Sequence, residues 1–142
     1  MTGAETPTIG ILSVDDNPHV GDALRKRLSR IDGFQWDGWL PSADALVDYV
    51  STRCPHIVLL DIDMPGKDPF EALAELVARC PDSRVLVFSG HVRRDLIQRA
   101  TDAGAWGYVS KNDAEDSLID AIRGVAEGEF VISDEVRLIL GG

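Results

Sequence analysis

The sequence predicts an α/β protein built on a five-stranded, doubly wound parallel sheet with helices on both faces. Two observations predict this fold. Short apolar runs alternate five times with segments whose apolar residues recur at helical spacing. The third run, "IVLL" at residues 57–60, has no polar position, as expected of a strand that is covered on both faces in a parallel sheet.

The composition fits one ordinary globular domain and argues against some partners. The chain has 142 residues, 44% of them hydrophobic, with 24 acidic residues against 14 basic ones. The net charge of −10 disfavours direct binding to nucleic acid, which requires a basic surface. No secretory leader and no membrane-spanning run is recognisable, so we expect a cytoplasmic protein without membrane contact. We divide the chain into a tail at residues 1–8, a domain at 9–127 and an extension at 128–142 that could begin a linker.

Each predicted strand is a short run rich in branched and aromatic residues. The run "FQWDGWL" alternates only weakly between apolar and polar residues, which is typical of a strand at the edge of a sheet. In chain order, the strands are predicted at residues 9–14, 34–40, 57–61, 84–89 and 106–111.

Each predicted helix carries an apolar stripe at spacings of three and four residues, and the last of them is expected at about 114–127. Ser42 is expected to cap the second helix, Asp68 the third, and Asp113 with Asp116 the fifth. The residues after the fifth helix add a short amphipathic piece. In chain order, the stripes are Val20, Leu24, Leu28 and Ile31; Leu46, Val47 and Val50; Leu73, Leu76 and Val77; Leu96, Ile97 and Ala100; and Leu118, Ala121, Ile122 and Val125.

Polar side chains stand at the ends of four of the five predicted strands. Asp15 and Asp16 follow the first strand and Asp61 closes the third, while Ser89 ends the fourth and Lys111 the fifth. Because parallel strands end at the same edge of a sheet, these side chains are expected to converge there. Each of them alone also has a structural explanation, such as capping of the first helix or an ordinary surface lysine. Their convergence from separate parts of the chain favours a chemical role for the group over these separate structural explanations.

The residue types at this edge favour phosphoryl transfer assisted by a metal ion. Packed carboxylates repel one another, and one would stay protonated unless a cation joined them. Oxygen ligands of this kind suit Mg²⁺, which takes a few carboxylates, waters and a phosphoryl oxygen. With such an ion in place, Asp61 can attack phosphorus as a carboxylate nucleophile. Lys111 and Ser89 would then hold the oxygens of the transferred group.

This pattern resembles the receiver domain of response regulators in bacterial two-component signalling, over nearly the whole predicted domain. Asp15 and Asp16 match the family's acidic pair, and Asp61 with the following Met-Pro-Gly matches the phosphoacceptor aspartate. Ser89 matches the family's hydroxyl residue and Lys111 its lysine. The sequence around these two residues and the "GEFVIS" tail are most similar to receivers of helix-turn-helix transcriptional regulators.

The resemblance implies a signalling domain rather than an enzyme in the usual sense. A histidine kinase would phosphorylate Asp61 in a reaction that requires Mg²⁺, and the domain would assist its own phosphorylation and dephosphorylation. Asp16, Asp61 and the backbone carbonyl of Asp63 would bind Mg²⁺ directly, while Asp15 would act through a water molecule.

The resemblance also implies an output surface. Ser89 and Tyr108 would act as the switch, and the face of the fourth helix, fifth strand and fifth helix would bind a partner or form a homodimer. A C-terminal DNA-binding domain, common in such regulators, does not follow in this sequence. The chain is either a stand-alone receiver or a part of a longer regulator.

Two residues near the predicted site are candidate modulators. Asp63 is expected at the mouth of the pocket, where its carboxylate could repel or orient water that attacks the phosphorylated Asp61. His91, two residues after Ser89, is a candidate pH-sensitive modulator. Exposed charged residues without a special role explain both positions as well.

Two other functions remain open at this point. A haloacid-dehalogenase-type phosphatase also places apolar residues before an Asp-x-Asp, and Asp63 would then be its general acid/base. Against it, Met64 stands where Thr or Val is expected, and the second acidic pair precedes Asp61 instead of following Lys111. A receiver-like adaptor that binds partners without phosphorylation would need neither Asp16 nor Lys111.

Overall fold

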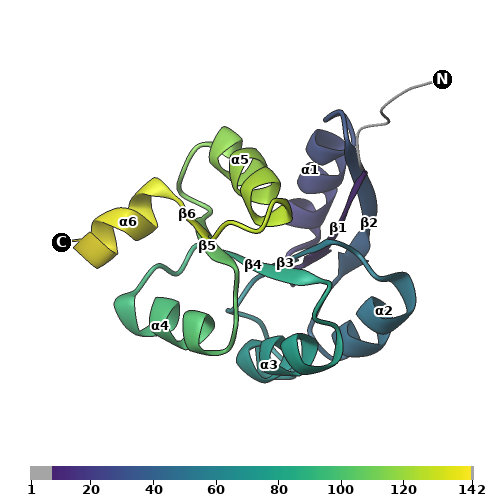
Figure 1. Cartoon of the computed structure of the whole chain (residues 1–142), viewed down its shortest axis with the longest axis horizontal. Coiled ribbons are helices and arrows are strands. Elements are labelled where there is room, and N and C mark those ends of the chain that lie inside the picture. Colours follow the sequence, from purple (N-terminus) through teal and green to yellow (C-terminus); the bar gives the residue numbers. More distant parts are fainter. Residues whose placement is uncertain (1–7, 142) are drawn as a thin grey trace.

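A computed structural model describes residues 8–141 of the chain, and Figure 1 shows their arrangement. Strands and helices alternate from the first element to the last. The strands are β1 (Ile9–Val14), β2 (Phe34–Leu40), β3 (Ile57–Leu60), β4 (Arg84–Ser89), β5 (Gly107–Ser110) and β6 (Val131–Ile132). The helices are α1 (Pro18–Leu28), α2 (Leu46–Arg53), α3 (Pro69–Arg79), α4 (Arg94–Asp102), α5 (Glu115–Ala126) and α6 (Asp134–Gly141).

The strands form one parallel sheet in the order β2-β1-β3-β4-β5-β6. Helices α1 and α5 cover one face and α2, α3 and α4 the other (Figure 1). The order of the first five strands is the flavodoxin-like, doubly wound order. The predicted fold class is therefore confirmed, including the edge position of β2. The strand count differs by one, because the extension adds β6 to the outer edge of β5.

The sheet separates two apolar cores, and β3 contributes to both because its side chains alternate between the faces. Val58 and Leu60 pack under α2, α3 and α4, whereas Ile57 and Leu59 pack under α1 and α5. All four side chains are at most 1% exposed. This double coverage explains the uniformly apolar run.

The predicted helix starts and stripes are only partly correct. Asp68 caps α3 as expected, with its side chain accepting a hydrogen bond from the backbone of Phe70. Ser42 does not cap α2, which begins after Ala45 without a side-chain cap, because Ser42 closes a separate turn by accepting from Asp44 N. The sequence pattern predicts Val77 on the buried stripe of α3, but its side chain is 41% exposed.

The C-terminal extension was expected to add only a short amphipathic piece, but it forms both a strand and a helix that pack on the domain. β6 pairs with β5 in parallel register, and α6 packs with Val136 fully buried. The prediction that Asp113 and Asp116 cap α5 is wrong, because α5 begins after Ala114 without a side-chain cap. The carboxylate of Asp113 accepts instead from the backbone N–H of Glu135 in the first turn of α6. Within residues 8–141, no helix combines the length and apolar character needed to cross a bilayer.

Candidate functional site

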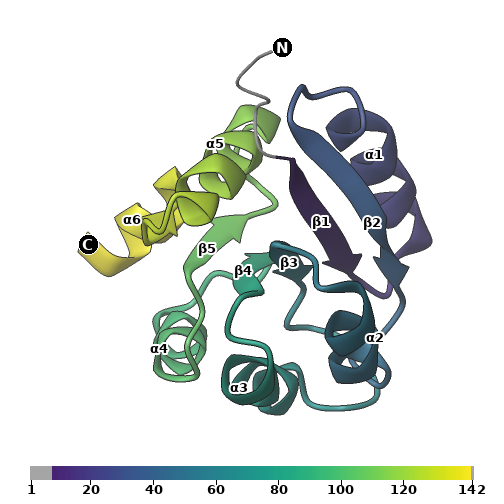
Figure 2. The same ribbon diagram turned by 45° about the vertical axis from the view of Figure 1, so that its right-hand side comes forward.

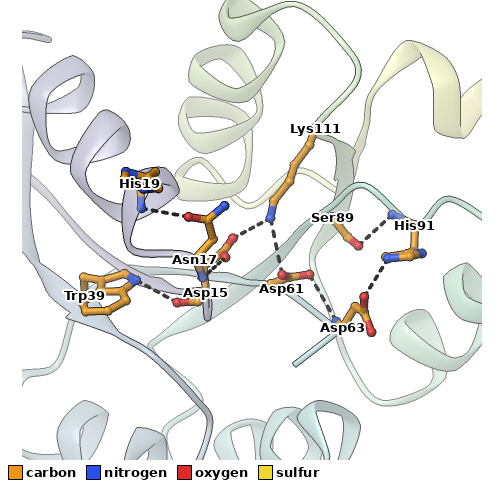
Figure 3. A network of polar contacts seen from close by, with 9 residues as sticks. All are labelled: Asp15, Asn17, His19, Trp39, Asp61, Asp63, Ser89, His91 and Lys111. Atoms are coloured by element: carbon orange, nitrogen blue, oxygen red, sulfur yellow. Dashed lines mark hydrogen bonds and ion pairs between the residues drawn. The ribbon is translucent and has the colours of Figure 1, made fainter. Parts of the chain in front are cut away.

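The predicted site residues lie together at the carboxyl-terminal edge of the parallel sheet (Figure 3). The strands that end at this edge are seen from a second side in Figure 2. Asp15 and Asp61 are the first residues beyond β1 and β3, Ser89 is the last residue of β4, and Lys111 directly follows β5. Figure 3 shows the carboxylates of Asp15 and Asp61 facing the ammonium group of Lys111. The parallel topology therefore brings these four side chains into one site.

Three carboxylates of this site lie close enough to share a cation. One oxygen each from Asp15, Asp16 and Asp61 lies within 4.8 Å of the others. Asp15 and Asp61 are buried, whereas Asp16 is exposed to solvent. The start of α1 is capped by Asn17, whose side chain accepts from His19 N. Because Asn17 meets the capping requirement, the two preceding acids are not needed for it.

Lys111 lies between the two buried carboxylates. Its Nζ is 2.5 Å from Asp15 Oδ2 and 3.4 Å from Asp61 Oδ2. Burial by itself would lower the pKa of Lys111, but the hydrogen bond to Asp15 and the charges of Asp61 and Asp15 outweigh it, so the pKa is raised. The ammonium group is thus held in its charged form beside Asp61.

The environment of Asp61 disfavours its negatively charged form. Its side chain is 8% exposed, and burial raises its pKa above the ordinary value of 3.8. The charge of Lys111 and the hydrogen bond that Asp61 accepts from Asp63 N oppose this rise, and the neighbouring Asp15 adds to it. A bound cation, or a bond from Asp61 to an electrophile, would stabilise the site, because both reduce the density of negative charge there.

The loop after β3 is fixed by contacts and a backbone conformation that explain the glycine of the Met-Pro-Gly motif. Gly66 has a φ of 93°, a left-handed conformation that side-chain-bearing residues rarely adopt. The next residue, Lys67, donates its backbone N–H to Asp44 Oδ1 at 2.8 Å. The turn therefore holds the chain beyond Asp61 in a defined position.

Ser89 and Tyr108 lie on neighbouring strands and meet at the backbone of His91. Ser89 Oγ accepts from His91 N at 3.0 Å, and the Tyr108 hydroxyl donates to His91 O at 2.5 Å. Tyr108 is 1% exposed, and burial raises its pKa to about 12. Its ring points inward, so the loop between β4 and α4 is tied directly to β5.

Asp63 and His91 meet at the exposed rim of the site. Asp63 Oδ2 is 2.8 Å from His91 Nε2, and the two side chains are 70% and 56% exposed. Figure 3 shows this pair bridging the loops that follow β3 and β4. The pairing of these two residues was not predicted, although both positions were.

One site residue was missed by the sequence reasoning. Trp39, near the end of the edge strand β2, donates its indole N–H to the backbone carbonyl of Asp15 at 2.8 Å. It thereby fixes the chain at the acidic pair, and Figure 3 shows it on the far side of Asp15 from Lys111. The only available signal was a tryptophan close to a strand end, which more often means packing than positioning.

The chain is similar to a known protein family and to several known regulators. The "Response regulator receiver domain" family matches residues 11–123. The chain is 36% identical over 129 residues to the transcriptional activator protein ExaE of Pseudomonas putida, covering 87% of this chain and 58% of ExaE. It is 30% identical over 128 residues to the response regulator UvrY of Escherichia coli K12, covering 90% of this chain and 59% of UvrY. It thus spans under two thirds of these relatives.

The fold comparison agrees with the sequence comparison. The crystal structure of a two-component response regulator of the LuxR family from Aurantimonas sp. SI85-9A1 matches with a TM-score of 0.89 at 27% identity, covering 94% of this chain and 96% of that one. These matches favour neither the phosphatase nor the adaptor. The family match over most of the chain establishes that this protein belongs to the response regulator receiver domains of two-component signalling.

Proposed function

We propose that Asp61 is the phosphoacceptor of this receiver and that a histidine kinase is its donor. The observation that carries the proposal is the position of Asp61, buried at a strand end between Lys111 and the acidic pair. An oxygen of Asp61 forms a bond to phosphorus while the bond between phosphorus and the donor's nitrogen breaks, and that nitrogen takes up a proton from solvent. The product is an acyl phosphate on Asp61.

The chain's own residues assist this transfer. Asp16, Asp61 and the backbone carbonyl of Asp63 would hold Mg²⁺, with Asp15 acting through water; the clustered carboxylate oxygens fit such an ion. When bound, Mg²⁺ neutralises charge on the phosphoryl oxygens. Lys111, already 3.4 Å from Asp61, is placed to pair with another of these oxygens.

Ser89 and Tyr108 would form the switch that reports the new group. Ser89 must turn from His91 N toward a phosphoryl oxygen, which changes the loop whose carbonyl receives the Tyr108 hydroxyl. The outward signal would pass through the face of α4, β5 and α5. In the structure β6 and α6 lie along this face, so a partner or a second copy bound there would contact α6 as well. By analogy with these relatives, the signal would control a DNA-binding domain in a longer chain.

The decisive experiment is intact-protein mass spectrometry after incubation with acetyl phosphate and Mg²⁺. We expect one added phosphoryl group on the parent protein and none on Asp61→Asn. Omission of Mg²⁺ should reduce the modified fraction strongly. Phosphate release without accumulation would instead indicate a phosphatase, and absence of any reaction would indicate an adaptor; either result would overturn the proposal.

Mg²⁺ is expected to stabilise the folded domain, because only the folded chain assembles the acidic cluster. At a concentration one hundred times its Kd, the gain in the free energy of unfolding is about 2.7 kcal/mol. Thermal unfolding with and without MgCl₂ measures this gain. Asp16→Asn should abolish most of it, while Asp48→Asn, an exposed acid on α2, should leave it unchanged. Equal gains in both variants would place the ion elsewhere.

The pair of Asp63 and His91 is proposed to limit access of water to the phosphorylated Asp61. Both side chains are exposed, so the effect on the decay rate is expected to be modest, up to about fivefold, as for other exposed ion pairs. Asp63→Asn and His91→Gln should each speed the decay of the acyl phosphate. If they act as a pair, the double variant decays no faster than either single one. Unchanged or additive rates would refute the pairing.

A further inference from the structure

Helix α6 is held at its first turn by the loop between β5 and α5. Glu135 Oε1 accepts hydrogen bonds from Ser110 Oγ at 2.7 Å and from Asn112 Nδ2 at 3.1 Å. The backbone N–H of Glu135 donates to the carboxylate of Asp113 at 3.0 Å. These three hydrogen bonds, which we call the clamp, therefore hold the start of α6 to the residues on both sides of Lys111.

The entry to α6 adds a backbone link to the same loop. Ser133 directly precedes the helix, and its hydroxyl accepts from Ser110 N at 2.9 Å. Its own backbone N–H donates to Tyr108 O at 3.2 Å. Ser133 is 6% exposed, and Val136 one turn later is fully buried. The start of α6 is therefore fixed to β5 rather than resting loosely on it.

The far part of α6, at Ile139 and Leu140, is held by the start of α4. Arg94, the first residue of α4, donates from its guanidinium group to the backbone carbonyl of Ile139 at 2.8 Å and to that of Leu140 at 3.3 Å. Arg94 follows the loop that carries Ser89 and His91.

We infer that α6 is a strap between the loop that begins with Lys111 and the start of α4, which follows the loop after Ser89, and that its docking is coupled to the state of Asp61, with Glu135 and Arg94 as the positioning residues. The inference rests on the proposed function of Asp61. Its basis is the bridging geometry: one helix contacts both the loop that begins with Lys111 and the first residue of α4, to which the loop after Ser89 leads.

The direction of the coupling follows from the geometry. The two sets of contacts fit the loops as they stand with Asp61 unmodified, while Ser89 is turned to His91 and Lys111 to Asp15. When Ser89 and Lys111 turn toward a phosphoryl group, the separation of the loops changes. A rigid helix cannot follow both changes at once, so one of its two sets of contacts weakens. Phosphorylation therefore loosens α6, and by reciprocity release of α6 favours the phosphorylated form.

The test combines hydrogen exchange with a binding titration, using beryllium fluoride with Mg²⁺ as the probe of the phosphorylated state. In the parent protein, the probe should speed amide exchange in residues 131–141 at least fivefold. Glu135→Ala and Arg94→Ala should speed that exchange without the probe and should bind it several-fold more tightly. A merely structural role would leave the affinity for the probe unchanged.

Matched controls separate the strap from general effects of charge. Asp134→Ala removes an acid from the same turn of α6 that pairs with Arg137, and Arg93→Ala removes a neighbouring arginine that pairs with Asp95. Both should behave as the parent protein. Unchanged or slower exchange on probe binding, or unchanged affinity in the variants of the two positioning residues, would overturn the inference while Asp61 still accepts a phosphoryl group. If acetyl phosphate also fails to modify the parent, the proposed function fails and the inference falls with it.

Discussion

Lys111→Met is expected to destabilise the metal-free protein by roughly 2 to 4 kcal/mol at neutral pH, because it leaves two buried carboxylates without their shared cation. Asp15 and Asp61 are 3% and 8% exposed, and the ammonium group is the only basic side chain within 4 Å of either in the described part of the chain. Chemical denaturation in urea, in buffer without divalent cations, measures this loss.

The loss should depend on pH in a defined direction. The pKa of Asp61 is already raised by burial, and removing Lys111 raises it further. A raised pKa means that the folded protein binds more protons than the unfolded chain, so stability falls as the pH rises through that interval. The deficit of the variant is therefore full at pH 7 and shrinks on acidification toward pH 4. A deficit that grew on acidification would contradict the electrostatic explanation.

A matched control distinguishes burial of the ion pair from loss of a lysine. Lys67→Met removes the Lys67–Glu75 pair, which has a distance of 2.6 Å but lies nearer the surface, with 29% and 41% of the side chains exposed. Its cost should stay at or below about 1 kcal/mol and vary little with pH above 5. Mg²⁺ should reduce the deficit of the Lys111 variant relative to the parent protein, whereas it should stabilise the Lys67 control and the parent equally and leave the control's deficit unchanged. Equal costs in both variants would mean that burial is irrelevant.

The sequence predicts which side chains meet at the carboxyl-terminal edge of the sheet, because topology alone decides it. Once "IVLL" is recognised as a doubly covered strand, Asp61 must lie at its end, and parallel pairing places Asp15 and Lys111 beside it. No knowledge of side-chain packing is needed for that step. The expected contacts of residues 15, 61 and 111 follow from strand order.

Features that depend on tertiary contacts were less predictable. Ser42 has the residue type of a helix cap, yet the chain turns once more before α2 begins. Asp113 caps α6 instead of the adjacent α5, because the extension folds back onto the loop that contains it. Strand β6 has only two residues, too few for a pattern in sequence. These outcomes depend on where distant segments pack, which local residue types do not encode.

The docking of β6 should depend on the absence of a side chain at Gly107. The two residues paired across β5 and β6 there are Gly107 and Val131. A Cβ at residue 107 would lie 2.4 Å from the carbonyl oxygen of Val131 and 2.7 Å from a methyl group of Leu86. The first contact is with backbone, which cannot rotate away, and the second is with a fully buried core residue. β6 must therefore move, or β5 must shift from β4.

Gly107→Ala is consequently expected to lower the free energy of unfolding by about 3 kcal/mol, the upper part of the range for overpacked sites. The amide protons of Val131 and Ser133, which donate to Trp106 O and Tyr108 O, should lose their protection from exchange first. Gly90→Ala is the matched control, because a Cβ there meets nothing within 4 Å. It should be neutral or stabilising by a few tenths of a kcal/mol. Retained protection of both amides in Gly107→Ala would show that β6 is not seated against β5 as the structure has it.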